Sequence, residues 1–185
     1  MKRIGVDIDG VIADSQPVII DKLNRLFGKN YTLEDFVDFD SVKMFGVGRS
    51  HLDRLIMEKE LEIIEEAVPL PGAVETLNQL RDGNRIIIVS ARTPAYLNQT
   101  LAWLERYGIR HDELLLLGQH DKRQSCLDLC VDIFIEDNKK NAEQIASCGI
   151  PVLLMDATYN RGKLPDTITR VHSWTEIRDC ILKPL

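Results

Sequence analysis

The sequence lacks several features that would place it in a special class of protein. Only 11 of its 185 residues are glycine and 7 are proline, while 44% are hydrophobic, which excludes a disordered or fibrous chain. No uncharged apolar run reaches the ~18 residues of a membrane span, and the N-terminus has no signal-peptide cleavage site. We therefore expect a globular protein that works in the cytoplasm without a membrane partner.

Aromatic residues are also scarce, and the four cysteines show no metal-binding spacing. Aromatics make up 6% of the chain, and no CxxC or CxxH pair occurs. Zinc is therefore a poor candidate ligand, and we expect the cysteines to be buried free thiols. They are Cys126, Cys130, Cys148 and Cys180.

An excess of positive charge is missing as well. The 29 acidic residues outnumber the 23 lysines and arginines, giving a formal net charge of −6. This balance argues against a long nucleic acid as partner, because such polymers bind to basic stripes. A small anionic ligand stays compatible, since a metal ion or a nearby cationic side chain can reverse the charge of one pocket.

Short apolar runs rich in β-branched residues recur along the chain, and helical patterns lie between them. Such runs predict strands buried on both faces of a parallel sheet. They cover residues 4–8, 85–89, 114–117, 131–135 and 152–155. The intervening helices are expected at 73–80, 94–107 and 139–147, with Thr93 and Asn138 as N-caps of the last two. The alternation predicts an α/β fold with a Rossmann-like, doubly wound parallel sheet.

About sixty residues after the first strand contain no strand-like run. Amphipathic helical patterns cover 16–27 and 52–64, with a helix start at Thr32 between them. We predict a helical cap at 15–68 inserted into a core of residues 1–14 and 69–185, with two ordinary helices packed on the sheet as the alternative. The segment holds five aromatics that either stack on a ligand or simply pack together: Phe27, Tyr31, Phe36, Phe39 and Phe45.

The first strand ends in Asp7-Ile8-Asp9-Gly10-Val11. Ligands of open α/β sheets collect at the carboxyl ends of the strands. Unpaired buried charge is costly, so two aspartates at this place have no evident structural reason. The pair therefore marks a candidate site.

Polar residues also follow the second and fourth predicted strands, as Ser90-Ala91-Arg92 and Glu136-Asp137, and Lys122 precedes the latter strand. In a parallel sheet these groups meet at one edge. Each pair of like charges about 4 Å apart costs about 4 kcal/mol at an effective dielectric constant of ~20, so a cation is required there. An all-oxygen site selects a hard cation, most simply Mg²⁺. Together with a hydroxyl and a lysine, such a site suits a phosphate group.

This order of motifs resembles the haloacid dehalogenase-like phosphohydrolase superfamily over nearly the whole chain. Within it, the chain looks like the 5′(3′)-deoxyribonucleotidase branch and its bacterial relatives. The helical insert and the segments Ile4-Gly-Val-Asp-Ile-Asp-Gly, Ile135-Glu-Asp-Asn and Arg170-Val-His-Ser-Trp carry this closer resemblance. The resemblance implies a phosphomonoesterase that acts on a small phosphorylated substrate, with a nucleoside monophosphate as the leading candidate.

The resemblance also implies a role for each matching residue. Asp7 would attack phosphorus and become a phosphoaspartate, while Asp9 would serve as general acid and then general base. Mg²⁺ would be bound by the Asp7 carboxylate, the Asp9 backbone carbonyl and Asp137. The phosphoryl oxygens would be held by Ser90, Lys122 and a backbone N–H near Ala91.

Two positions depart from the pattern of that branch. Glu136 stands where an aspartate is usual, so we expect it beside the metal ligands rather than among them. Arg92 either bridges a substrate phosphate or pairs with an acid at the sheet edge, and a Ser-x-Arg pattern is also seen in polynucleotide phosphatase domains. Alternative functions are therefore a phosphatase for another small phosphomonoester or a polynucleotide 3′-phosphate, or a metabolite-binding protein without activity. The oligomeric state does not follow from the sequence.

Overall fold

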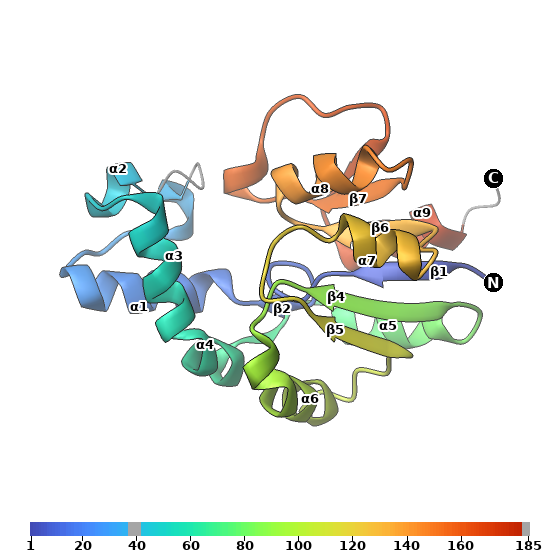
Figure 1. Ribbon diagram of the computed structural model, residues 1–185, viewed down its shortest axis with the longest axis horizontal. Helices are drawn as coiled ribbons and strands as arrows, with labels where there is room; N and C mark the ends of the chain where they lie inside the picture. The colour runs from blue at the N-terminus through green and yellow to red at the C-terminus, as the bar shows by residue number, and fades with distance from the viewer. Residues whose placement is uncertain (37–41, 183–185) are drawn as a thin grey trace.

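The computed structural model describes residues 1–36 and 42–182, which form a six-stranded parallel sheet with helices on both faces (Figure 1). The strand order is β5-β4-β1-β6-β7-β8. The strands are β1 (Arg3–Val6), β4 (Arg85–Ser90), β5 (Glu113–Leu116), β6 (Ile133–Glu136), β7 (Val152–Met155) and β8 (Ile168–Val171). This architecture confirms the predicted α/β, doubly wound fold.

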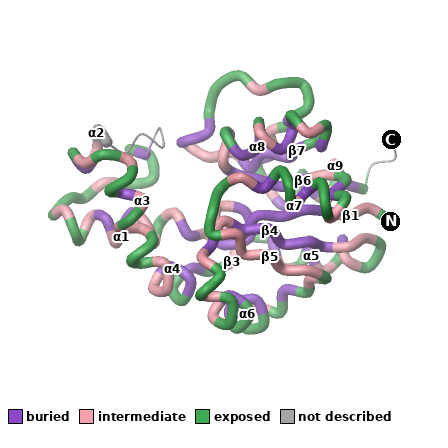
Figure 2. Tube along the Cα trace, viewed as in Figure 1, coloured by how far each residue is buried: buried purple, intermediate pink, exposed green. Residues whose placement is uncertain are grey.

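Apolar side chains alternate between the two faces of the sheet. On β4, Ile86 and Ile88 belong to one core cluster, and Ile87 and Val89 belong to the other. The first cluster packs under α5 (Ala73–Arg81), α6 (Leu97–Arg106) and α9 (Trp174–Leu182); the second packs under α7 (Arg123–Asp128) and α8 (Lys139–Ala146). Figure 2 shows the interior strands β1, β4, β6 and β7 largely buried and many helical residues exposed. Continuous apolar runs such as β4 therefore have the burial that their sequence predicts.

A helical insert separates β1 from the rest of the sheet. Its two ends form a short antiparallel pair, β2 (Ala13–Asp14) and β3 (Val68–Pro69). Between them lie α1 (Gln16–Phe27), the 3₁₀ turn η1 (Leu33–Asp35), α2 (Val42–Phe45), α3 (Arg49–Glu58) and α4 (Glu60–Glu66). These helices lie together to one side of the sheet, on the left in Figure 1. The division into two domains stays a prediction.

The structure corrects several details of the sequence analysis. The predicted helix at 52–64 is two helices, α3 and α4, that meet at Lys59. Strand β8 was not predicted, and the helix expected at 94–107 begins as the 3₁₀ turn η2 (Pro94–Tyr96). Thr93 precedes this turn but makes no side-chain cap, whereas Asn138 caps α8 as expected.

The cysteines are free, as predicted, but they are not all buried. Cys126 is buried, Cys148 and Cys180 are partly buried, and Cys130 is exposed. Burial raises the pKa of the Cys126 thiol to about 12, so this group is an inert part of the core. Among the described residues, no helix is both long enough and apolar enough to cross a membrane.

Candidate active site

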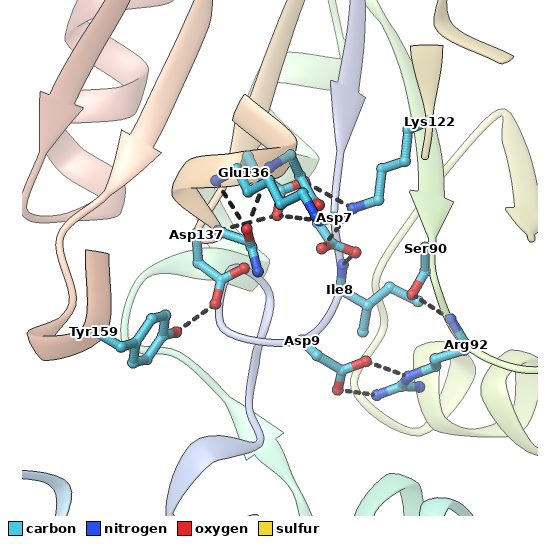
Figure 3. A network of polar contacts seen from close by, with 12 residues as sticks. Asp7, Ile8, Asp9, Ser90, Arg92, Lys122, Glu136, Asp137 and Tyr159 are labelled. Carbon is cyan, nitrogen blue, oxygen red and sulfur yellow. Dashed lines mark hydrogen bonds and ion pairs between the residues drawn. The ribbon is translucent and has the colours of Figure 1, made fainter. Parts of the chain in front are cut away.

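The centre of the site is a buried ion cluster at the carboxyl ends of β1 and β6 (Figure 3). Lys122 Nζ lies 2.6 Å from Asp7 Oδ2 and 2.7 Å from Glu136 Oε2. The other oxygen of Asp7 accepts the N–H of Ile8 at 2.7 Å, and that of Glu136 accepts the N–H of Asn138 at 3.1 Å. Both carboxylates are therefore fixed by the backbone as well as by the lysine.

Strand register explains why these residues meet. Val6 of β1 is level with Ile135 of β6, and the ladder continues one step further, where the Asp7 N–H donates to Ile135 O at 3.0 Å. Glu136 is the next residue on the neighbouring strand. Lys122 comes from the loop after β5, immediately before α7, and its side chain is fully buried. Tertiary packing therefore brings Lys122 to the two strand ends, where the sequence analysis expected it.

Two causes shift the pKa values in the cluster: burial, and the presence of three carboxyl groups beside a single lysine. Burial raises the pKa of Asp7 to about 7, although Lys122 opposes the shift. Burial and the neighbouring Glu136 raise the pKa of Asp137 well above its usual value. The pKa of Lys122 is raised, because Asp7 and Glu136 together outweigh the effect of its burial. The site thus holds more negative charge than its lysine neutralises.

The cluster fits a divalent cation. Asp7, Glu136 and Asp137 each offer one carboxylate oxygen, and these oxygens lie within 4.8 Å of one another. All the donors are oxygens, which suits a hard cation. The loop after β1 closes tightly on this group: Gly10 has φ +78°, and a Cβ there would lie 2.1 Å from Asp137 Oδ2. Glycine is therefore required at this position of the loop.

Asp137 has two partners that the sequence analysis missed. The hydroxyl of Tyr159 donates to Asp137 Oδ2, and Asn160 Nδ2 donates to the Asp137 backbone carbonyl at 2.6 Å. Both residues lie in the 3₁₀ turn η3 (Thr158–Asn160), just beyond the carboxyl end of β7. The sequence could have pointed to both residues, because ligands of an open α/β sheet collect at the carboxyl ends of its strands. Tyr159 and Asn160 follow the predicted strand at 152–155 in the same way that Asp7 follows β1.

Arg92 pairs with Asp9, which is one of the two arrangements that the sequence leaves open for this arginine. Its Nε lies 2.8 Å from Asp9 Oδ2 and its Nη2 lies 2.9 Å from Asp9 Oδ1, a bidentate pair. Burial alone would raise the pKa of Asp9, but the Arg92 guanidinium outweighs this effect and the pKa is lowered. Asp9 is therefore ionised at neutral pH, whereas Asp7, with a pKa of about 7, is ionised only in part.

The predicted site residues share one cleft of about 330 Å³. Those that line it are Asp7, Asp9, Ser90, Ala91, Arg92, Glu136 and Asp137. Lys122 contacts the same cluster from a buried position. The opposite wall of the cleft comes from the helical insert and includes Ile19, Phe36, Ile56 and Met57. The same wall also carries Arg49, Asp53 and Glu60, so the cleft joins a charged floor on the sheet to a mixed wall on the insert.

Three of the aromatics in the insert pack together rather than facing the cleft. The ring of Phe45 lies 5.2 Å from that of Phe27 and 5.3 Å from that of Tyr31. Phe36 does line the cleft, and Phe39 lies outside the described residues. Hydrophobic packing therefore accounts for most of the aromatics that the sequence concentrates here.

Comparison with known proteins agrees with this geometry. The family model described as "5′ nucleotidase, deoxy (Pyrimidine), cytosolic type C protein" matches residues 1–184. A protein of Halalkalibacterium halodurans is 33% identical over 178 residues, which cover 96% of this chain and 91% of that protein. A nucleotidase of Clostridium acetobutylicum is 30% identical over 175 residues, covering 95% of this chain and 91% of that protein.

Solved structures show the same fold. A haloacid dehalogenase-like family hydrolase from Streptococcus pneumoniae superposes with a TM-score of 0.71 at 16% identity, covering 98% of each chain. The matching family model and the nucleotidase relatives identify the chemistry, and the structural likeness identifies the fold. The chain belongs to the 5′ nucleotidase, deoxy (Pyrimidine), cytosolic type C protein family, and it is a hydrolase of phosphoric monoesters with a haloacid dehalogenase-like fold.

Proposed function

We propose that this hydrolase is a Mg²⁺-dependent nucleotidase that removes the phosphate of deoxynucleoside monophosphates through a phosphoaspartate on Asp7. The observation that carries the proposal is the buried cluster of Asp7, Glu136 and Asp137 around Lys122 at one edge of the sheet. The substrate class is supported by the description of the matching family, and a cytoplasmic location stays a prediction from the sequence.

Each step of the proposed reaction uses a group that the structure brings to the cleft. A carboxylate oxygen of Asp7 attacks phosphorus, the bond from phosphorus to the ester oxygen breaks, and Asp9 gives that oxygen a proton. Water then attacks the phosphorus, Asp9 takes a proton from the water, and Asp7 is regenerated as inorganic phosphate leaves. Two displacements with prearranged positive charge lower a barrier that is among the highest for uncatalysed hydrolysis.

The ionisation of Asp9 suits the second step. Because Arg92 lowers its pKa, Asp9 rests as the carboxylate that accepts a proton from water. The first step draws on the minority of chains in which Asp9 carries a proton. One residue two positions from the nucleophile therefore serves both steps.

Other residues in the proposal bind the metal and the phosphate. Asp7 and Asp137 would hold the cation through their carboxylates, and Asp9 through its backbone carbonyl. The bound cation would neutralise the excess negative charge and polarise the phosphoryl group. Ser90, the N–H near Ala91 and Lys122 would hold the phosphoryl oxygens.

Glu136 has a supporting role in the proposal. Its carboxylate accepts from Lys122 and from the Asn138 N–H, so we place it beside the metal ligands, where it orients the lysine. The apolar part of the insert wall, at Ile19, Phe36 and Ile56, would take the nucleoside.

The test is phosphate release from a panel of phosphomonoesters, with Mg²⁺ and with a chelator. The panel contains deoxy- and ribonucleoside 5′- and 3′-monophosphates, sugar phosphates and a 3′-phosphorylated oligonucleotide, with Asp7→Asn as the blank. We expect Mg²⁺-dependent turnover that favours deoxynucleoside monophosphates. Turnover of another class alone would contradict the substrate assignment, and turnover by Asp7→Asn would contradict the mechanism.

A further inference from the structure

Arg92 contacts Asp9, Thr100 and the ring of Trp103, so its guanidinium has a defined position from which it binds the Asp9 carboxylate. Two of its guanidinium nitrogens are paired with Asp9, and the third, Nη1, lies 3.5 Å from Thr100 Oγ1. The guanidinium also lies 5.7 Å from the ring centroid of Trp103. Only 3% of the Arg92 side chain is exposed. Arg92 therefore sets the direction of the Asp9 carboxylate.

The backbone next to Arg92 is bound by the helical insert. Glu60, the first residue of α4, accepts the backbone N–H of Thr93 at 2.6 Å through one carboxylate oxygen and the Thr93 hydroxyl through the other. The residue that follows Arg92 is therefore gripped by both oxygens of a single carboxylate. The two residues are 33 positions apart in the chain, so this contact joins the insert to the loop after β4.

A second contact joins the far end of α4 to the support beneath Arg92. Trp103 Nε1 donates to the carbonyl of Ala67, which directly follows α4, at 2.8 Å. The first residue of α4, Glu60, thus binds the loop that carries Arg92. The residue after the helix, Ala67, binds the Trp103 ring that lies against the Arg92 guanidinium. Contacts therefore connect both ends of α4 to the surroundings of the Arg92–Asp9 pair.

We infer that Glu60 is a positioning residue for Asp9: by holding Thr93 it fixes the backbone from which Arg92 orients the acid–base carboxylate. The inference rests on the proposed function, in which Asp9 transfers the proton. It assigns to the insert a part in proton transfer in addition to covering the substrate. Proton transfer depends steeply on alignment, and an error of about 1 Å in placement can cost up to ~100-fold in rate.

A competing explanation is that Glu60 contacts the substrate itself, because it also lines the cleft. Loss of a substrate contact would weaken binding of all substrates of similar shape by a similar factor. Misplacement of Asp9 would instead lower kcat/KM, which reports the steps up to departure of the leaving group, most for those substrates whose leaving group needs a proton. The two explanations therefore differ in how the loss depends on the leaving group.

The experiment measures kcat/KM for a series of substituted phenyl phosphates, from nitrophenols to unsubstituted phenol, with Mg²⁺ present. The substrates have nearly the same shape but differ in the acidity of the phenol that leaves. In Glu60→Ala we expect a loss of at least about tenfold for the poorest leaving group and less than about threefold for the best. In Glu60→Ala, kcat/KM should therefore depend more steeply on the acidity of the leaving phenol than in the wild type. Asp9→Asn is the reference and should show the steepest dependence.

Two further variants separate the contact from general damage to the fold. Thr93→Val removes only the hydroxyl bond and keeps the N–H bond to Glu60, so we expect a smaller change of the same kind, and Thr93→Ser should restore the wild-type dependence. Glu65→Ala changes an exposed glutamate of the same helix and is the matched control, with wild-type behaviour expected.

The other possible outcomes contradict either the inference about Glu60 or the proposed function. An equal loss for every leaving group in Glu60→Ala and Thr93→Val would assign Glu60 to substrate binding or to the fold and overturn the inference, as would no change in either. Failure of the wild-type protein to hydrolyse any phosphate, both here and in the nucleotide panel, would overturn the proposed function and the inference with it.

Discussion

At the residue scale, Asp7 and Asp9 show how two identical side chains two positions apart acquire different chemistry. Asp7 is buried against Lys122, and its burial raises its pKa to about 7. Asp9 is gripped by Arg92, which lowers its pKa in spite of burial. Environments that push two carboxyl pKa values apart are typical of groups with separate tasks in catalysis. The end of the first predicted strand indicates where these aspartates lie. Their pKa values, however, are set by neighbours that come from other parts of the chain.

The Asp9→Asn variant tests the division of labour. We expect it to accept the phosphoryl group slowly and then to stop, because an amide cannot take a proton from the attacking water. With a nitrophenyl phosphate, rapid mixing should show about one equivalent of nitrophenol released per chain and an acid-stable, hydroxylamine-sensitive phosphoenzyme. Asp7→Asn is the control and should show no release. Continuous turnover of Asp9→Asn at the wild-type rate would contradict the role of Asp9.

The raised pKa of Asp7 makes metal binding dependent on pH. A metal-free Asp7 with a pKa of about 7 carries a proton below that pH, and the cation must displace it. Mg²⁺ affinity should therefore fall by about tenfold for each pH unit below 7, or more steeply if Asp137 also releases a proton. Calorimetric titration in buffers of different ionisation enthalpy measures both the affinity and the protons released. An affinity that does not change between about pH 5 and pH 7 would show that neither carboxyl group is a ligand.

At the element scale, the sequence predicts the buried strands well and the marginal elements poorly. The apolar runs at 85–89 and 152–155 lie in interior strands of the sheet, β4 and β7, where burial on both faces requires an apolar residue at nearly every position. Strand β8 is at the edge of the sheet, and its middle residues, Thr169 and Arg170, are exposed or half-buried. With only two apolar residues in four, β8 gives no such pattern. Its pairing depends on β7, which a local reading of the sequence does not include.

Contacts between distant elements account for what was missed in the site. Each strand end could be located, because parallel strands bring their carboxyl ends to one edge. The partners of Arg92 could not, since Asp9 and Thr100 lie on different elements, and nothing local distinguishes an arginine that binds phosphate from one that binds a carboxylate. Glu60 is equally inconspicuous in a helix with several glutamates. Its role depends on where the insert packs.

The N-terminus of α8 provides a prediction about stability. Asn138 Oδ1 accepts the N–H groups of Lys140 and Asn141 at 3.0 and 3.2 Å, which satisfies two donors of the first turn. Asn138→Ala should therefore lower the free energy of unfolding by about 1 kcal/mol, or the melting temperature by roughly 2–4 °C. Asn138→Ser, which keeps a capping oxygen, should recover most of the loss. Scanning calorimetry in the absence of metal measures the effect, and equal melting temperatures for alanine and serine would contradict it.

At the scale of the whole molecule, the two junctions between sheet and insert are anchored by two buried tryptophans. Trp174 Nε1 donates to Val11 O just before β2, and Trp103 Nε1 donates to Ala67 O just before β3. Both side chains are 1% exposed, so these bonds are protected from water. The two hydrogen bonds thus fix both ends of the insert to helices that pack on the sheet. They thereby also fix the position of the insert relative to the cleft that it lines.

The excess negative charge of the site links metal binding to the stability of the whole fold. The pKa of Asp137 is raised well above its usual value, so at neutral pH its ionisation is less favourable in the folded than in the unfolded chain. Asp137→Asn removes that unfavourable charge and can still accept from Tyr159. We therefore expect its metal-free form to melt at a higher temperature than the metal-free wild type.

The same substitution should reverse the order once metal is added. A cation that binds only the folded wild type stabilises it by about 2.7 kcal/mol at one hundred times its dissociation constant, a rise of about 5–10 °C for a chain of this length. Asp137→Asn lacks a ligand oxygen with full charge, so its rise at the same Mg²⁺ concentration should be much smaller. Asp179→Asn, on the exposed side of α9, is the matched control and should follow the wild type in both conditions. A variant that melts below the metal-free wild type, or that keeps the full rise with Mg²⁺, would show that the negative charge of Asp137 serves the fold and not the cation.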